Sequence, residues 1–429
     1  MKRFAISFLA ILLPVAVSAG GPEFDEYFTG GCLRIDLFHT GTAESEVYAV
    51  DEILKERFWG GNPRNLIDTL GLGGHMVRVF DQATNMQIFS RGYCSLFGEW
   101  VTTDEAIEGT HRTFHETLMI PWPRRPVQVR IDRRDRENVF HTVFDLVVDP
   151  ADYHIGTQRR YSRFRVVRLE NNGDPPDKVD LAILADGYAA DEMHKLRGDA
   201  ERFVGALFDT DPYSKRRKDF NVYLVESVSR ESGVDDPRKE RYRDNLLGLS
   251  FNSFDLDRYM LSSSNKVIRD VASLVPYDII VILANEEKYG GGGIFNLYAT
   301  SISDNEHDEY VFTHEFGHAF AGLGDEYYSS KVSYNDMYPR GVEPWEPNIT
   351  ALLDTTKIKW GDMIDAGTPV PTPADSSSAG VVGVFEGAGY SAEGLFRPYL
   401  DCRMKSKGMI DFCPVCRSAI ERMIDFHTR

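Results

Sequence analysis

The chain has 429 residues, of which 42% are hydrophobic and 12% aromatic, so it is long enough for two or three domains with sizeable cores. This hydrophobic content excludes wholesale disorder. The formal net charge of −18 argues against a nucleic-acid partner, because phosphate binding depends on clustered Lys and Arg side chains. We therefore expect a multidomain globular protein.

Residues 1–19 have the pattern of a secretory signal peptide. Lys2 and Arg3 precede an apolar run over residues 4–17, and the small residues of Val17-Ser18-Ala19 offer a cleavage site before Gly20. The run is short for a membrane span and no later run is longer, although an uncleaved anchor is the alternative. We expect an exported protein, secreted, periplasmic or at the cell surface, with no stable membrane span in its mature form.

Residues 20–150 contain short stretches of alternating polarity separated by turn residues, which predicts an all-β sandwich. Met76–Phe80 and Met86–Ser90 are typical of a β-hairpin. His111 and His115 have a spacing compatible with a metal ion but lack a clear third ligand. We expect these two histidines to be hydrogen-bonded or exposed rather than metal-bound.

A polar connection over residues 151–177, with one expected strand at 164–169, separates this domain from the rest of the chain. From residue 178 to 429 strands and helices alternate, which predicts an α/β sheet with helices on its faces. The expected strands cover residues 179–185, 220–225 and 277–283, and the expected helices cover residues 193–207, 256–274 and 414–426.

A run of four glycines occupies residues 290–293. It does not lead from a strand into a helix with a Lys-Ser/Thr pair, so we do not expect a nucleotide-binding loop. We interpret it as a tight turn into an edge strand where an extended peptide could pair, or as a merely flexible loop. Residues 329–395 are rich in loop-forming residues and form either a mobile flap over the cleft or a surface excursion.

Five cysteines in an exported chain allow two disulfides and one free thiol. Cys32 and Cys94 lie in the first domain, whereas Cys402, Cys413 and Cys416 lie near the C-terminus. No second pair follows Cys413-Pro-Val-Cys416, and no thioredoxin-like pattern frames it. We predict a structural disulfide from Cys402 to Cys413 or Cys416.

The motif His314-Glu-Phe-Gly-His318 carries the clearest chemistry. Two histidines four residues apart lie on one face of a helix and can bind the same metal ion, for which zinc is well suited. Gly322 is expected to end this helix, and the turn then brings Asp325 and Glu326 back toward the histidines. Either carboxylate could be the third ligand of an open catalytic zinc site.

Motifs along nearly the whole mature chain resemble the IgA-peptidase family of bacterial zinc metallopeptidases, which are metzincin-like enzymes with an N-terminal β-sandwich domain. Besides the metal helix and the Asp325-Glu326-Tyr327 segment, the resemblance rests on Tyr27-Phe28, Leu33-Arg34-Ile35-Asp36, Glu99-Trp100, Thr103-Asp104-Glu105-Ala106, Asp186-Gly187-Tyr188, residues 289–296, Glu386-Gly387-Ala388, Arg397-Pro398 and Cys402-Arg403-Met404.

The resemblance implies a methionine in a tight turn beneath the metal, and Met404 is the matching candidate. The glycine and the acidic residue after the second histidine each fall one position later than in the common H-E-x-x-H-x-x-G-x-x-H pattern. We favour Asp325 as the third zinc ligand, with Glu326 as the alternative.

These parts predict peptide hydrolysis, in which one zinc ion polarises a water molecule and Glu315 accepts its proton before protonating the leaving amine. A tyrosine hydroxyl could help to stabilise the oxyanion. Candidates for contacting the oxyanion or the substrate are Tyr327, Tyr328, Tyr289, Tyr399 and Gly292.

The predicted function is that of a secreted zinc endopeptidase acting on extracellular proteins, with immunoglobulin A the substrate that the family name suggests. The alternative is an exported surface protein that binds protein or glycan and whose metal site is only structural. Glu315 counts against this alternative, because a structural zinc site needs no base there. The sequence assigns neither a structural calcium ion nor an oligomeric state.

Overall fold

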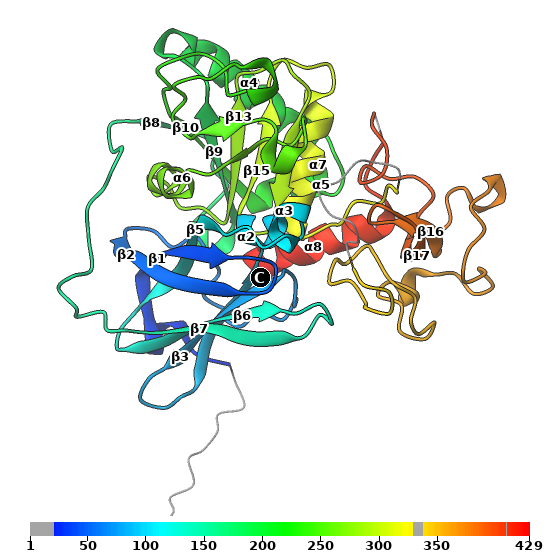
Figure 1. The fold of residues 1–429 in the computed structure, drawn as a ribbon, viewed down its shortest axis with the longest axis horizontal. Helices are drawn as coiled ribbons and strands as arrows, with labels where there is room; N and C mark the ends of the chain where they lie inside the picture. The colour runs from blue at the N-terminus through cyan, green and yellow to red at the C-terminus, as the bar shows by residue number, and fades with distance from the viewer. Residues whose placement is uncertain (1–20, 329–337, 409) are drawn as a thin grey trace, which may run out of the picture.

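The computed structural model of the protein describes residues 21–328, 338–408 and 410–429. The expected signal peptide lies outside these residues. In the described part, two antiparallel sheets come first along the chain, and a larger mixed sheet with flanking helices follows (Figure 1). The protein is therefore built from a β-rich N-terminal part and an α/β part, as predicted.

The N-terminal sheets pack face to face on one core. The first sheet has the order β2-β1-β5 and the second has the order β4-β3-β6-β7. The predicted hairpin is confirmed as the antiparallel pair of β3 and β4. The strands are β1 (Phe28–Gly41), β2 (Glu46–Glu56), β3 (His75–Asp81), β4 (Gln87–Tyr93), β5 (Arg112–Pro123), β6 (Val127–Arg134) and β7 (Phe140–Val148).

Alternation along β1 separates the two sides of this strand. Leu33, Ile35 and Leu37 point into the core shared with the second sheet. Arg34 and Asp36 therefore point to the opposite face, where they are also fully buried, because the α/β part covers them. Short helices connect the strands: α1 (Phe24–Tyr27), α2 (Leu96–Trp100) and α3 (Asp104–Ile107).

The α/β part contains a sheet of six strands in the order β14-β15-β13-β9-β10-β8. The four inner strands run parallel, and the two edge strands run antiparallel to their neighbours. The strand expected in the connection is β8, which belongs to this sheet. The strands are β8 (Arg165–Glu170), β9 (Val179–Asp186), β10 (Phe220–Glu226), β13 (Ile279–Ala284), β14 (Gly291–Ile294) and β15 (Tyr298–Ile302).

Helices cover both faces of this sheet because its central strand is apolar on both sides. Leu181 and Ile183 of β9 join the core formed with α4 (Met193–Phe208), α7 (Asp308–Ala321) and α8 (Pro414–Thr428). Ala182 and Leu184 join a second core with α6 (Asn265–Ala272). Among the described residues, no helix combines the length and the apolar character needed to cross a membrane.

The predicted helix over residues 256–274 is wrong in its first half. Leu261–Ser262 forms the short strand β12, which pairs with β11 (Leu249–Ser250), and α6 begins only at Asn265. The Ser262 hydroxyl donates to the Leu247 carbonyl and accepts the N–H of Ser264 at 2.9 Å. Serine side chains that bond to nearby backbone in this way compete with helix formation.

The remaining described α-helices and strands lie in the connections of the α/β part. They are α5 (Tyr213–Arg216) and the hairpin of β16 (Phe385–Ala388) and β17 (Ser391–Arg397). Most of this hairpin lies within the loop-rich stretch expected over residues 329–395, of which residues 329–337 are outside the described part.

Buried polar contacts join the two parts of the molecule. The fully buried Arg34 guanidinium donates to Asp36 at 2.9 Å, to Glu56 at 3.1 Å and to Asp270 of α6 at 2.8 Å. Nearby, Asn265 lies 3.0 Å from Nδ1 of His115. His115 is thus a hydrogen-bonded residue of this junction, and His111 is exposed, as expected for both.

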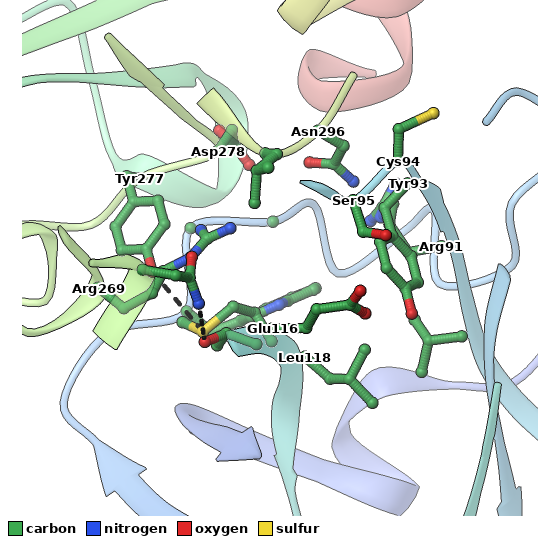
Figure 2. A pocket seen from close by; sticks show the side chains of 18 of the residues that line it. Arg91, Tyr93, Cys94, Ser95, Glu116, Leu118, Arg269, Tyr277, Asp278 and Asn296 are labelled. Atoms are coloured by element: carbon green, nitrogen blue, oxygen red, sulfur yellow. Dashed lines mark hydrogen bonds between the residues drawn. The ribbon is translucent and has the colours of Figure 1, made fainter. Parts of the chain in front are cut away.

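A pocket of about 980 Å³ also lies at this junction. Figure 2 shows Glu116 of β5 pointing into it, with Arg269 and Tyr277 of the α/β part on one side and Tyr93 of β4 on the other. The last helix closes the junction, because its His427 lines the pocket and accepts a hydrogen bond from Asn62 through its carbonyl. Figure 1 shows α8 running along the boundary between the two parts.

We expect Arg34→Ala to lower the free energy of unfolding by about 3–5 kcal/mol, because it leaves several buried carboxylates without their cation. Denaturant-induced unfolding measures this change. The matched control is Arg230→Ala, which removes an ion pair to Asp244 whose side chains are 85% and 56% exposed and should cost about 1 kcal/mol or less. Equal effects of the two substitutions would contradict the assigned role of Arg34.

Candidate metal centre

Helix α7 presents one face to the core and another to a pocket. Phe312, Phe316 and Phe320 are buried in the core beneath the sheet, as the helical spacing predicts. The helix ends at Gly322, which has a φ of 63°, a left-handed conformation that glycine adopts without steric cost. The chain therefore turns sharply after α7, and Asp325 returns beside the helix.

The side chains of His314, His318 and Asp325 converge on one point. The two Nε2 atoms lie 3.1 Å apart. Asp325 Oδ1 lies 3.1 Å from Nε2 of His314 and 3.3 Å from Nε2 of His318. This oxygen is buried and has no hydrogen-bond donor among the described residues. The three atoms form a small triangle of potential ligands on the floor of a pocket.

Backbone carbonyls hold the two imidazoles in one tautomer. Nδ1 of His314 lies 3.0 Å from the carbonyl oxygen of Arg403, and Nδ1 of His318 lies 2.5 Å from that of Leu323. A carbonyl can only accept, so Nδ1 of each ring carries a proton and Nε2 is the nitrogen left to contact a metal ion. This arrangement is the usual way in which proteins orient metal-binding histidines.

The triangle fits a small divalent cation. Zinc binds imidazole nitrogen and carboxylate oxygen at about 2.0–2.2 Å, so two ligands in a tetrahedral arrangement lie about 3.3 Å from each other. The distances of 3.1 to 3.3 Å between the ligand atoms are close to this value. Three protein ligands leave a fourth position free on the pocket side, which is typical of catalytic rather than structural zinc sites.

Asp325 and Glu326 point in opposite directions. Glu326 is fully buried behind the helix, where Oε1 accepts from Asn348 at 3.0 Å and from the Cys416 thiol at 3.1 Å. Its carboxylate is not part of the triangle of His314, His318 and Asp325. The structure therefore brings together the two histidines and Asp325, and it places the alternative ligand in a different cluster.

Charges in the centre shift several pKa values. Burial raises the pKa of Glu315, and the nearby imidazoles only partly oppose this shift. Burial lowers the pKa of His318, but Asp325 and Glu315 outweigh it and raise the pKa to about 9. Burial also disfavours ionised Asp325, yet the two imidazoles hold its pKa well below 3.8. The imidazole of His318 and the carboxylate of Asp325 thus stabilise each other's charged forms.

The segment around Met404 lies directly under α7. The Met404 sulfur is fully buried against Gly317, between the two histidines in sequence. The Met404 carbonyl accepts from the Glu326 N–H at 2.8 Å, and the preceding Arg403 carbonyl holds His314. The candidate methionine therefore lies in a turn that contacts both the helix and the segment after it.

The candidate residues for contacting the substrate differ in whether they line the pocket that contains the metal ligands. Tyr327 lines the pocket, which has a volume of about 930 Å³, whereas Tyr328, Tyr289 and Tyr399 are not among its lining residues. Gly292 faces Tyr259, and its neighbours Gly291 and Gly293 face α7. A Cβ atom on Gly293 would lie 2.3 Å from the Glu315 carbonyl oxygen, so only glycine allows β14 to lie this close to the metal helix.

Several residues of the pocket are not linked to the metal motif by any spacing in the sequence. Tyr390 donates a short hydrogen bond to Oδ2 of Asp325, although it follows Asp325 by 65 residues. Glu99 comes from the N-terminal part, and Trp345 and Glu346 come from the loop-rich stretch. No spacing rule connects such residues to the His-Glu-x-x-His motif, because only the fold brings them together.

The predicted disulfide is wrong. All five cysteines are free, and the Sγ atoms of Cys402 and Cys416 lie 3.8 Å apart, well beyond the 2.05 Å of a disulfide bond. The sequence alone does not show that the carboxylate of Glu326 lies among these thiols. The thiols of Cys402, Cys413 and Cys416 instead surround Glu326.

Comparison with known families covers most of the chain. The family model described as IgA Peptidase M64 matches residues 167–378 and 374–424. The model described as Peptidase M64 N-terminus matches residues 23–145. A comparison with curated proteins finds no match.

We expect the stability of the protein to respond to Glu99→Gln in a pH-dependent way. Burial raises the pKa of Glu99 from 4.5 to about 7, so the folded protein favours the protonated form. In the wild type, Glu99 makes its full contribution to the free energy of unfolding below pH 4.5, and this contribution is lost as the pH rises through 7. A glutamine at this position does not ionise, so it loses nothing. The free energy of unfolding of the variant relative to wild type should therefore increase across this interval.

Denaturant unfolding at a series of pH values measures this difference, with the exposed Glu108→Gln as the control. A difference for Glu99→Gln that stays constant with pH would show that Glu99 has the same pKa in the folded and unfolded states.

Proposed function

The chain belongs to the IgA peptidase M64 family, a family of metallopeptidases, and we propose that it is an exported zinc-dependent endopeptidase. The observation that carries the proposal is the convergence of His314, His318 and Asp325 within 3.3 Å of one another, beside Glu315. Zinc is the proposed cation because two imidazoles and one carboxylate with a free fourth position are its typical catalytic ligands.

Glu315 is the proposed general base and acid. When bound, zinc supplies a Lewis acid that polarises the scissile carbonyl and acidifies water. Glu315 removes a proton from the attacking water and later delivers it to the leaving amine. Burial supports this double role, because a carboxylate with a raised pKa accepts a proton more readily than an exposed one. Tyr327, which lines the pocket, is the favoured donor to the developing oxyanion.

The glycine strand β14 is the proposed binding edge for the substrate backbone. β14 pairs with β15 on one side, and on the other side Gly291 exchanges hydrogen bonds with residues 258–260. By the alternation of an antiparallel pair, the N–H and C=O of Gly293 point to the same outer side as those of Gly291. Gly293 lines the pocket next to His318, so an extended peptide paired there would pass over the metal ligands.

The proposed substrates are extracellular proteins. The sequence of residues 1–19 supports export, and the family description makes immunoglobulin A one candidate substrate. Substrate choice depends on the walls of the pocket, which include Trp345, Glu346 and Tyr390.

We expect Glu315→Gln to lower kcat/KM for peptide hydrolysis by about 10²–10⁴-fold, because glutamine has the same shape but cannot accept the proton. Hydrolysis of immunoglobulin A and of casein measures the loss, and metal analysis of the same samples should show unchanged metal content. A wild-type protein that holds its metal but cleaves neither protein would favour the binding-protein alternative. A variant that cleaves as fast as wild type would remove Glu315 from the mechanism.

A further inference from the structure

A second cluster of metal-binding side chains lies behind the first. The thiols of Cys402, Cys413 and Cys416 and the carboxylate of Glu326 each offer an atom within 4.8 Å of the others. All four residues are buried, with exposures between 0% and 3%. They come from three segments: the chain after Asp325, the turn that contains Met404, and the first turn of α8.

The separations between these groups match metal ligands better than a disulfide. A tetrahedral zinc ion with Zn–S bonds of about 2.3 Å holds its sulfurs about 3.8 Å apart. The Sγ atoms of Cys402 and Cys416 are 3.8 Å apart, and Cys416 Sγ lies 3.1 Å from Glu326 Oε1.

Backbone N–H groups already point at the sulfurs of the cluster. The N–H of Cys413 donates to Cys402 Sγ at 3.2 Å, and that of Cys416 donates to Cys413 Sγ at 3.5 Å. Cys413 is the N-cap of α8, a helix of 15 residues whose N-terminal end favours negative charge. These contacts stabilise thiolates, the form of cysteine that binds metals.

The surroundings of the Glu326 carboxylate point independently to a bound cation. Its Oε2 atom is buried and has no hydrogen-bond partner among the described residues, and its Oε1 atom contacts only an amide and a thiol. Burying a carboxylate is costly unless both of its oxygens are satisfied by hydrogen bonds or a bound cation. A disulfide between two of the cysteines would leave this carboxylate unexplained, whereas a metal ion would explain all four side chains together.

We propose that Cys402, Cys413, Cys416 and Glu326 bind a structural zinc ion, separate from the one bound by His314, His318 and Asp325. Three thiolates favour zinc, iron or copper over calcium or magnesium, and four protein ligands leave no open position for catalysis. The proposal does not depend on peptidase activity, because none of its ligands lines the catalytic pocket.

This second ion would fix the catalytic centre from behind. Glu326 directly follows Asp325, so a metal bond to Glu326 restrains the segment that carries the proposed catalytic ligand. Cys402 directly precedes Arg403, whose carbonyl holds His314 at 3.0 Å. Both segments would be tied to the start of α8. The site therefore acts as a positioning element for the residues around the first metal.

Metal analysis of the purified full-length protein tests the proposal. We expect about two zinc ions per chain in wild type, about one in Cys416→Ser and about one in His318→Ala. Cobalt-substituted wild type and His318→Ala should both show a near-ultraviolet thiolate-to-cobalt charge-transfer band that Cys416→Ser lacks. The control Cys32→Ala changes a buried cysteine of β1 outside the cluster and should retain both ions and the band.

A thiol count on denatured, unreduced wild type in the presence of chelator gives an answer even where Cys416→Ser does not fold. Five free thiols together with about two metal ions per chain support the proposal. About three free thiols would show a disulfide. Five free thiols with about one metal ion per chain, and loss of that ion in His318→Ala, would show that the cluster binds no metal. Its side chains would then be neutral thiols and a neutral carboxylic acid. Either of the last two results overturns the proposal.

Discussion

One carboxylate oxygen contacts two imidazole nitrogens at the centre of the candidate metal site, and the surrounding elements hold this contact in place. Asp325 Oδ1 lies 3.1 and 3.3 Å from the Nε2 atoms of His314 and His318, and such lone-pair-bearing atoms stay together only if a cation or shared protons lie between them. The groups around these three atoms restrict their movement. The carbonyls of Leu323 and Arg403 orient the rings, and Tyr390 orients the carboxylate.

The scaffold provides this restriction through its two cores. Helix α7 is fixed to the sheet by Phe312, Phe316 and Phe320, so its opposite face is held at the end of β14 and β15. The N-terminal part contributes Glu99 to the same pocket, and the buried contacts of Arg34 with α6 keep that part in place. The β-rich part therefore helps to shape the pocket and is not a separate appendage.

Local patterns in the sequence account for the parts of the candidate site that lie on one helix and its end. The i, i+4 spacing of His314 and His318 and the glycine at the helix end depend only on neighbouring residues, and the alternation of strands and helices predicts the α/β sheet. The sequence favours Asp325 as the third ligand but leaves Glu326 open as the alternative, because both residues follow the same turn. What separates them is the side to which the backbone directs each carboxylate, and this depends on contacts with Met404 and Asn348 far along the chain.

The errors of the sequence-based account have the same origin. The helix expected over residues 256–274 fails where serine hydroxyls bond to the backbone of another segment. The expected disulfide fails because Glu326, far from the cysteines in sequence, completes their cluster. Tyr390 and Glu99 reach the pocket only through tertiary structure, which a single sequence does not reveal.

We propose that His314, His318 and Asp325 share one zinc ion. Anomalous diffraction at the zinc edge, from crystals grown without chelator, tests this proposal most directly. We expect a peak at about 2.0–2.2 Å from both Nε2 atoms and from one Asp325 oxygen. Zinc-containing crystals with no peak at this position, or with Glu326 in place of Asp325 as the ligand, would contradict it.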